Sequence, residues 1–145
     1  SERMRLDVSV NMLAYQAIKN KVINIFGGNQ IRPNIHIDDL VDVYAHFLEQ
    51  DHPTGVYNAG FENLKIIEIA NMIKRKTNAS LNIEKKYNDP RSYRLSSDKL
   101  LETGFKPKRN VEMAINELIT LYTNNLDAFN DSNFNVKWLK KNQFN

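Results

Sequence analysis

The sequence contains no cysteine, only five glycines and four prolines, and no long hydrophobic run. Without cysteine, disulfide scaffolds, thiolate metal sites and cysteine nucleophiles are excluded. Because no apolar run approaches the ~18–20 residues of a membrane span and no signal peptide is visible, we expect a soluble, cytoplasmic protein. A strong charge of one sign is also missing, since 20 lysines and arginines face 17 aspartates and glutamates, for a net charge of +3. This scattered excess permits an anionic ligand but does not indicate a nucleic-acid binder.

The chain has 145 residues, of which 41% are hydrophobic. That is enough for one domain with a core, because a domain of ~150 residues buries roughly 70% of its unfolded surface. It is too short for two enzyme domains of ordinary size, which take about 100–150 residues each. The first residues are Ser1-Glu2-Arg3-Met4, so we interpret residue 1 as a processed end, as the boundary of an expressed fragment or as a cut through a longer protein.

Hydrophobic spacing predicts helices over residues 8–20, 38–52, 64–77, 96–103 and 110–123, and short strands over residues 22–26, 34–37, 55–60 and 79–85. This alternation of about five helices with strands is typical of an α/β or α+β fold, but the strands are few and short for a self-sufficient parallel sheet. The second helix is expected to bury one apolar stripe, which comprises Val41, Tyr44, Phe47 and Leu48. Beyond about residue 124 the chain is rich in asparagine and weakly patterned.

The most informative stretch is Gly27-Gly28-Asn29-Gln30-Ile31-Arg32-Pro33, which follows the first predicted strand. Two glycines allow the backbone to turn tightly and to approach a ligand closely. Arg32 offers a planar guanidinium that can pair bidentately with a phosphate. Local chemistry leaves two interpretations open, an anion-binding turn and a hairpin turn with a solvated arginine. The stretch is not a dinucleotide fingerprint, because G-x-G-x-x-G is absent.

Two further clusters carry charged side chains. Residues 88–94, Asn-Asp-Pro-Arg-Ser-Tyr-Arg, form either an exposed charged loop or a second anion-binding element. His36 lies next to Asp38 and Asp39, but this spacing fits no known zinc pattern. We interpret this second cluster as a capped helix start with a packed histidine, and we expect no metal site.

Five segments occur in the order, and with similar gaps, of one known family. They are Met4–Asp7, residues 23–39 around the glycine turn, Gly55–Gly60 (Gly-Val-Tyr-Asn-Ala-Gly), Asp89–Tyr93 (Asp-Pro-Arg-Ser-Tyr) and Lys99–Pro107. Together they resemble the C-terminal, substrate-binding half of the NAD(P)-dependent sugar-nucleotide epimerases and dehydratases, which are extended short-chain dehydrogenases/reductases. The resemblance covers about residues 3–122. We therefore divide the chain into a nucleotide-sugar-binding region, residues 1–123, and an Asn/Lys-rich C-terminal tail, residues 124–145.

The resemblance implies an α/β fold completed by an N-terminal Rossmann half that this sequence lacks. In the family that half carries NAD or NADP and the catalytic tyrosine and lysine, and the full-length enzymes are commonly homodimers. We therefore expect this chain to hold no catalytic, cofactor-binding or metal-binding residue and to be inactive alone. Tyr15 and Lys19 match the family's Tyr-x-x-x-Lys spacing. They lie downstream of the place of that motif, on the wrong helix, so we interpret the match as coincidental.

The resemblance also assigns residues to the diphosphate of the nucleotide-sugar substrate. Arg32 falls on the family's arginine that contacts this diphosphate. Arg91 falls in the later loop, which supplies a second phosphate- or ribose-binding arginine in many members. That loop lacks the common Arg-x-Gly-Asp form here, and Lys86 stands nearer the usual position of the arginine. The assignment between Arg91 and Lys86 therefore stays open.

Four more residues complete the predicted substrate site. Asp7 and Val8 match the helix start that lines the nucleotide base in the family. Asn58 matches a strand end near the substrate pocket, and Gln30 belongs to the turn that carries the phosphate-binding arginine. The motifs do not specify the base, the sugar, the reaction outcome or the choice between NAD and NADP.

Two other classes of function stay open. One is a free-standing, non-catalytic module that binds a nucleotide sugar. The other is a small nucleic-acid binder, which predicts basic residues clustered with aromatics, whereas the 20 lysines and arginines here are scattered. In the leading interpretation an isolated chain leaves sheet edges and one helix face uncovered. We therefore expect it to pack against its missing half, a copy of itself or a domain-swapped partner.

Overall fold

The computed structural model describes residues 4–49, 54–84, 90–125 and 129–142. Its elements are α1 (Ser9–Asn20), β1 (Val22–Phe26), β2 (Ile31–Asn34), α2 (Ile37–Glu49), β3 (Glu62–Lys65), α3 (Ile66–Thr77), β4 (Ser80–Glu84), α4 (Asp98–Leu101), α5 (Val111–Asn124), η2 (Asp131–Asn133) and α6 (Asn135–Lys141). This order of helices and few short strands confirms the expected mixed α/β class. Within the described ranges, no helix combines the length and apolarity needed to cross a membrane.

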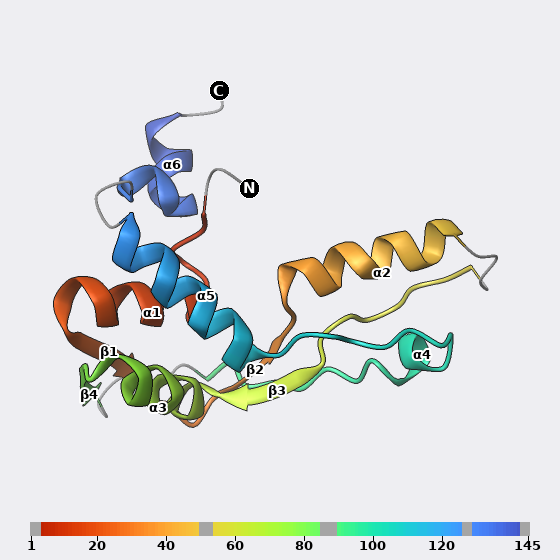
Figure 1. Cartoon of the computed structure of the whole chain (residues 1–145), viewed down its shortest axis with the longest axis horizontal. Coiled ribbons are helices and arrows are strands. Elements are labelled where there is room, and N and C mark those ends of the chain that lie inside the picture. The colour runs from red at the N-terminus through yellow and green to blue at the C-terminus, as the bar shows by residue number, and fades with distance from the viewer. Residues whose placement is uncertain (1–3, 50–53, 85–89, 126–128, 143–145) are drawn as a thin grey trace.

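Three helices and a parallel strand pair enclose the main core. α1 buries the stripe predicted for it, which comprises Val10, Leu13, Ala14 and Ala17. Other elements contribute Ile23 and Ile25 of β1, Ile69, Ala70 and Ile73 of α3, and Ile115, Leu118 and Tyr122 of α5. Figure 1 shows this part of the molecule on the left, with α2 and α4 extending from it as an arm. The amphipathic stripes of α1, α3 and α5 therefore build one shared core.

Two small sheets fix the position of the turn between β1 and β2. β1 pairs in parallel with β4, with Val22 opposite Ser80, and β2 pairs antiparallel with β3, with Arg32 opposite Leu64. The extended stretch predicted at residues 34–37 begins earlier than expected, because β2 starts at the end of the glycine turn and α2 starts within that stretch. The chain therefore passes directly from the turn into a paired strand and from that strand into α2.

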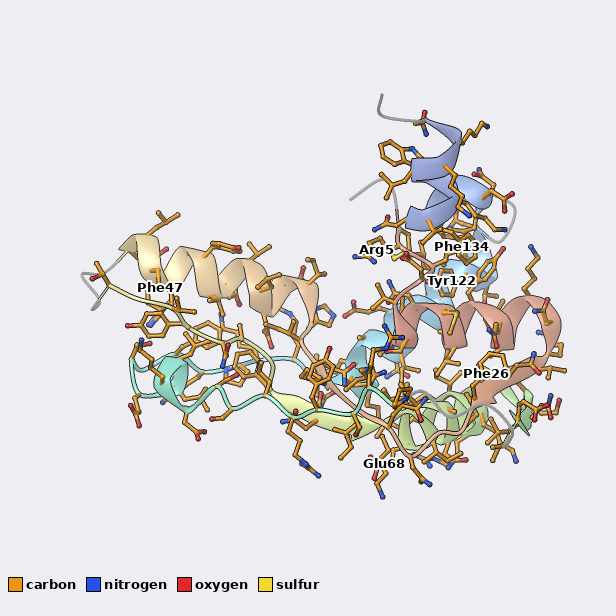
Figure 2. The ribbon with its side chains drawn as sticks, turned by 180° about the vertical axis from the view of Figure 1, so that it is seen from behind. Arg5, Phe26, Phe47, Glu68, Tyr122 and Phe134 are labelled. Carbon is orange, nitrogen blue, oxygen red and sulfur yellow. The ribbon has the colours of Figure 1, made fainter. Side chains whose placement is uncertain are left out.

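The apolar stripe predicted for α2 is wrong at three of its four positions. Val41, Tyr44 and Leu48 are exposed, at 58%, 69% and 86%. Phe47 faces inward as predicted, together with Asp39 and Val43 at intervals of four residues, and the two apolar ones pack with Leu100 and Phe105. Figure 2 shows Phe47 pointing from α2 towards the segment around α4. Both faces of α2 are apolar, and the small cluster beneath the helix covers only one of them.

The segment 54–60 runs back alongside α2 (Figure 1) and joins neither sheet of the described chain. Phe61 N donates to Asn34 O at 2.9 Å, at the end of the pairing between β2 and β3. The strand predicted over residues 55–60 is therefore not formed. A strand needs a neighbouring strand to share its backbone hydrogen bonds, and both described sheets lie elsewhere. Side chains hold the segment: Lys99 Nζ donates to Val56 O at 3.0 Å, and Gly60 N donates to Ser97 Oγ at 2.9 Å.

Candidate functional site

A glycine turn links β1 to β2. Gly27 and Gly28 have φ angles of +71° and +104°, a region that favours glycine. A Cβ atom at Gly28 would lie 3.0 Å from Ile25 Cδ1. Gln30 closes the turn, because Gly28 N donates to Gln30 Oε1 at 2.7 Å and Gln30 Nε2 donates to Phe26 O at 2.9 Å. The Gln30 side chain thus orders the turn that precedes β2.

Arg32 stands on β2, directly after this turn, with a partly buried side chain. Its Nη1 donates to the carbonyl oxygen of Ile31 at 3.0 Å and to the carbonyl oxygen of Arg91. Its guanidinium carbon lies 5.5 Å from the centre of the Tyr93 ring, within the range of a cation–π contact. The structure therefore brings the turn and the loop containing Arg91 together, although the two arginines are 59 positions apart.

Hydrogen bonds from both strands of the antiparallel sheet hold the loop 91–95. On the β2 side, Ile31 N donates to Ser92 Oγ at 3.0 Å and Tyr93 N donates to Ile31 O at 3.3 Å. On the β3 side, Leu95 N donates to Asn63 Oδ1 at 2.9 Å and Asn63 Nδ2 donates to Leu95 O at 3.0 Å. The loop is therefore fixed relative to Arg32 by its backbone at Tyr93 and Leu95 and by the hydroxyl of Ser92.

Tyr93 is a neighbour of Arg32 that was not predicted as a site residue. Its side chain is 54% exposed, and its ring lies beside the Arg32 guanidinium. The signal available in the sequence is its place between Arg91 and Arg94, where an aromatic ring alternates with two cations.

The predicted base-lining residues lie at the entry to α1. Val8 is the residue before the helix, and its side chain is 40% exposed. The carboxylate of Asp7 accepts from Arg5 Nε at 3.0 Å and from Asn135 N at 3.2 Å. The hydrogen bond from Arg5 holds the pKa of Asp7 below its usual value. Asp7 therefore has protein partners for both carboxylate oxygens.

The two remaining predicted site residues lie on other segments. Asn58 is exposed, and its Nδ2 donates to Ser96 O at 3.3 Å, which ties the segment 54–60 to the residue directly after the loop 91–95. Lys86 lies outside the described residues. The assignment of Asp7, Val8, Asn58 and Lys86 to the substrate thus stays a prediction.

The cluster at the start of α2 has partners within the protein. Asp38 N donates to His36 Nδ1 at 3.2 Å, and His36 Nε2 lies 3.0 Å from Glu117 Oε2. Because Nδ1 accepts, Nε2 carries the proton and donates to the carboxylate. One ring nitrogen of this buried histidine therefore accepts from the first turn of α2, and the other contacts α5.

Asp39 connects α2 to the segment that precedes α5. It is fully buried and accepts from Lys108 N at 3.3 Å, from Arg109 N at 3.0 Å and from Arg109 Nη1 at 2.9 Å. The hydrogen bond with Asp39, followed by that with Asp42, raises the pKa of Arg109 above its usual value. The three hydrogen bonds satisfy a carboxylate that would otherwise be costly to bury.

Tyr15 and Lys19 do contact each other, as their spacing on α1 requires. Lys19 Nζ donates to Tyr15 OH at 2.9 Å. The tyrosine ring is only 8% exposed and packs edge-to-face on Tyr122, with ring centres 5.5 Å apart. The pair belongs to the packing between α1 and α5.

The site favours an anion, and it does not fit a dinucleotide. An arginine fork beside a rigid turn matches the geometry of a phosphate. A dinucleotide fold needs a glycine-rich loop that opens a helix, whose N-terminus receives the pyrophosphate. Here the glycine turn opens strand β2 instead, and G-x-G-x-x-G is missing from the sequence. This turn therefore does not have the arrangement that receives the pyrophosphate of a dinucleotide.

No family model matches the chain, but several solved structures do. RMD from Pseudomonas aeruginosa, in complex with NADPH, is 18% identical with a TM-score of 0.71, over 83% of this chain and 44% of its own. The NAD-dependent NDP-hexosamine 5,6-dehydratase TunA of tunicamycin biosynthesis is 19% identical with a TM-score of 0.70, over 85% and 43%. UDP-glucuronic acid 4-epimerase from Bacillus cereus, in complex with UDP-glucuronic acid and NAD, is 24% identical with a TM-score of 0.68, over 84% and 41%.

The chain shares its fold with part of each of these proteins. It spans less than half of their length. The fold implied by the resemblance in the sequence is thus confirmed, including the match to only a part of longer enzymes. At these identities the likeness shows the fold alone.

Proposed function

We propose that this chain is the substrate-binding part of an NAD(P)-dependent sugar-nucleotide epimerase or dehydratase, in which it binds the diphosphate of the substrate. The observation that carries the proposal is the hydrogen bond from the Arg32 guanidinium to the carbonyl oxygen of Arg91 in the loop 91–95, beside a rigid glycine turn. The related structures support it, since one is an NDP-hexosamine dehydratase and another was solved with UDP-glucuronic acid and NAD.

Arg32 suits this role because the protein orients its guanidinium in advance. Two carbonyl oxygens, from Ile31 and Arg91, accept hydrogen bonds from Nη1. A guanidinium has five N–H donors in a planar fork, and it binds phosphate oxygens best when it is held in one orientation. The exposed Arg91 side chain adds a second positive charge on the loop. Two arginines on segments that contact each other suit the charge of a diphosphate.

Binding at the diphosphate serves a reaction that takes place elsewhere on the substrate. Contacts to a non-reacting group hold the sugar in register with the reacting centre. NAD or NADP, bound by a Rossmann half outside this chain, supplies the hydride chemistry. The residues described here bind and orient the substrate, and the chain alone is expected to be inactive.

The uncovered surface of the arm supports a second, larger partner domain. Ile37, Val41, Tyr44 and Leu48 form the outward stripe of α2, at 58–86% exposure, and Val56 is 85% exposed on the adjacent segment. A contiguous apolar patch of this kind marks an interaction site, and an extended segment outside a sheet can add to the edge of one. We propose that the Rossmann half covers this surface. Homodimerisation of the full-length enzyme stays a prediction.

The test is a binding experiment on the chain itself. Thermal-shift screening with UDP-, GDP-, CDP- and dTDP-sugars ranks the nucleotide, and isothermal titration calorimetry then gives the Kd of the best ligand. We expect Arg32→Ala to weaken binding about ten-fold or more without unfolding the chain, because it removes a charge-assisted, bidentate contact. Arg75→Ala, which removes an exposed arginine of α3, is the matched control and should leave Kd unchanged.

Two outcomes contradict the proposal. One is that no nucleotide sugar or nucleoside diphosphate shifts the melting temperature at millimolar concentration. The other is that Arg32→Ala and Arg75→Ala bind the selected ligand as tightly as the parent chain. The expected lack of activity is checked separately by following NAD reduction by its absorbance, with the same nucleotide sugars. Turnover by the isolated chain would show that its redox site has been missed.

A further inference from the structure

The aromatic ring of Tyr93 packs on the guanidinium of Arg32. The guanidinium carbon lies over the ring, 5.5 Å from its centre. The electron-rich face of an aromatic ring attracts a cation at this distance. Tyr93 is 54% exposed, so the pair lies at the surface of the protein, where an anion can reach it.

The backbone fixes the place of the ring. Tyr93 N donates to Ile31 O at 3.3 Å, and Ile31 N donates to the hydroxyl of Ser92 at 3.0 Å. Ile31 directly precedes Arg32 on β2, so the ring and the guanidinium extend from segments that are hydrogen-bonded to each other. Further hydrogen bonds tie the other end of the loop 91–95 to β3. The position of the ring therefore does not depend on a ligand.

The ring adds a constraint that the hydrogen bonds of Arg32 do not supply. Nη1 of Arg32 donates to the carbonyl oxygens of Ile31 and Arg91. A carbonyl oxygen accepts hydrogen bonds over a broad range of directions, so these two bonds locate one end of the guanidinium but allow its plane to tilt. The Tyr93 ring blocks part of this motion, because it lies beside the guanidinium.

A restraint of this kind favours anion binding. An unrestrained arginine side chain has many rotamers, and it loses this freedom when it binds an anion. A neighbour that holds the side chain in one orientation beforehand transfers the loss from the binding step to the folding of the protein. The contact with the ring thus tightens binding at the guanidinium without any contact between the ring and the anion.

We propose that Tyr93 is a positioning residue for the binding of a diphosphate at Arg32. Its ring restrains the guanidinium and does not itself contact the ligand. This inference rests on the proposed function, because it assumes that Arg32 binds the diphosphate. It adds to that function a role for the aromatic residue that stands between the two arginines of the loop.

The test compares variants that keep or remove the ring. Tyr93→Leu removes it, whereas Tyr93→Phe keeps the ring and removes only the hydroxyl. Tyr44→Leu, which removes an exposed tyrosine of α2, is the matched control. Each substitution is made in the parent chain and in Arg32→Ala, and thermal melting checks that each variant is folded. Calorimetry then gives the Kd of inorganic pyrophosphate and of whichever of UDP, GDP, CDP and dTDP binds tightest.

We expect Tyr93→Leu to weaken both ligands by the same factor, about three- to five-fold, which corresponds to the energy of one exposed cation–π contact. Tyr93→Phe should bind both ligands as the parent chain does, since its ring can occupy the same position, and so should Tyr44→Leu. In Arg32→Ala, Tyr93→Leu should cause no further loss of binding, because the guanidinium through which the ring acts is absent.

Four results overturn the inference. If Tyr93→Leu weakens only the nucleoside diphosphate, the ring contacts the nucleoside directly. If Tyr93→Phe weakens binding as much as Tyr93→Leu does, the hydroxyl contacts the ligand. If Tyr93→Leu binds both ligands like the parent chain, or weakens binding by Arg32→Ala further, the ring does not act through Arg32. A parent chain that binds neither pyrophosphate nor any of the four nucleotides instead refutes the proposed function.

Discussion

Tyr122 gives an unusual prediction, because removing a polar atom should stabilise the fold. The residue is fully buried, and its hydroxyl has no hydrogen-bond partner among the described residues. Its ring packs edge-to-face on Tyr15 and Phe129, with ring centres at 5.5 and 5.0 Å. Burial raises the pKa of Tyr122, so the side chain is uncharged at neutral pH. Tyr122→Phe therefore removes only an unpaired oxygen and keeps the ring.

The size of the effect follows from the burial of that oxygen. A buried hydroxyl without a partner costs about 1–3 kcal/mol. The small gap left by the oxygen takes back part of this gain. We expect Tyr122→Phe to raise the free energy of unfolding by about 1 kcal/mol, or Tm by about 3 °C for a chain of this length.

Tyr15→Phe is the matched control, since it lies in the same aromatic cluster but its hydroxyl accepts from Lys19 Nζ. Its loss should lower stability by about 0.5–1 kcal/mol, the typical value of one hydrogen bond. Both variants are compared with the parent chain by urea denaturation and by thermal melting. A Tyr122→Phe chain less stable than the parent would refute the reasoning, because it would show that the hydroxyl is satisfied.

Three further predictions concern the elements around the site. Asp39→Ala removes the buried acceptor of the Lys108 and Arg109 amides, and urea denaturation should show a loss of about 2–3 kcal/mol. The pKa of Asp42 is lowered from 3.8 by hydrogen bonds from Lys108 and then Arg109. Its contribution is therefore present above pH ~4 and lost at more acid pH, so the Tm deficit of Asp42→Asn should shrink between about pH 6 and pH 2.5. Gly28→Ala, at φ +104° with a Cβ 3.0 Å from a neighbouring side chain, should lower stability by at least about 1 kcal/mol in the same assay, and an unchanged Tm would contradict the strained turn.

Elements with one clear apolar stripe could be predicted from the sequence. α1 and α5 each place buried residues at helical spacing, and local periodicity is sufficient to locate such helices. The glycine turn could be predicted as well, because two adjacent glycines before a strand indicate positive φ angles, and both glycines have them. These features depend on residues close together in the sequence.

The features that could not be predicted depend on distant or external neighbours. α2 carries apolar residues on two faces, and periodicity does not tell which face meets Phe105 and which remains outside. The segment 55–60 has the composition of a strand, but pairing requires a neighbour that the described chain does not place beside it. The tail is attached in part through Asn133, whose contact with Met4 joins positions 129 residues apart. No local pattern reveals a contact of that kind.

The same distinction applies to the candidate site. The chemistry of Arg32 is visible in the sequence, because an arginine beside a glycine turn suits a phosphate. Its contact with the carbonyl of Arg91 and its position beside Tyr93 follow from the pairing of β2 with β3, which brings the later loop to the turn. The sequence also could not reveal that the Gln30 side chain is used in closing the turn.

The most direct test of the central claim is a crystal structure of this chain with the nucleoside diphosphate that it binds most tightly. The account predicts that phosphate oxygens lie within hydrogen-bond distance of the Arg32 guanidinium, beside loop 91–95. A nucleotide bound at another surface, with Arg32 making no contact to it, would contradict the account.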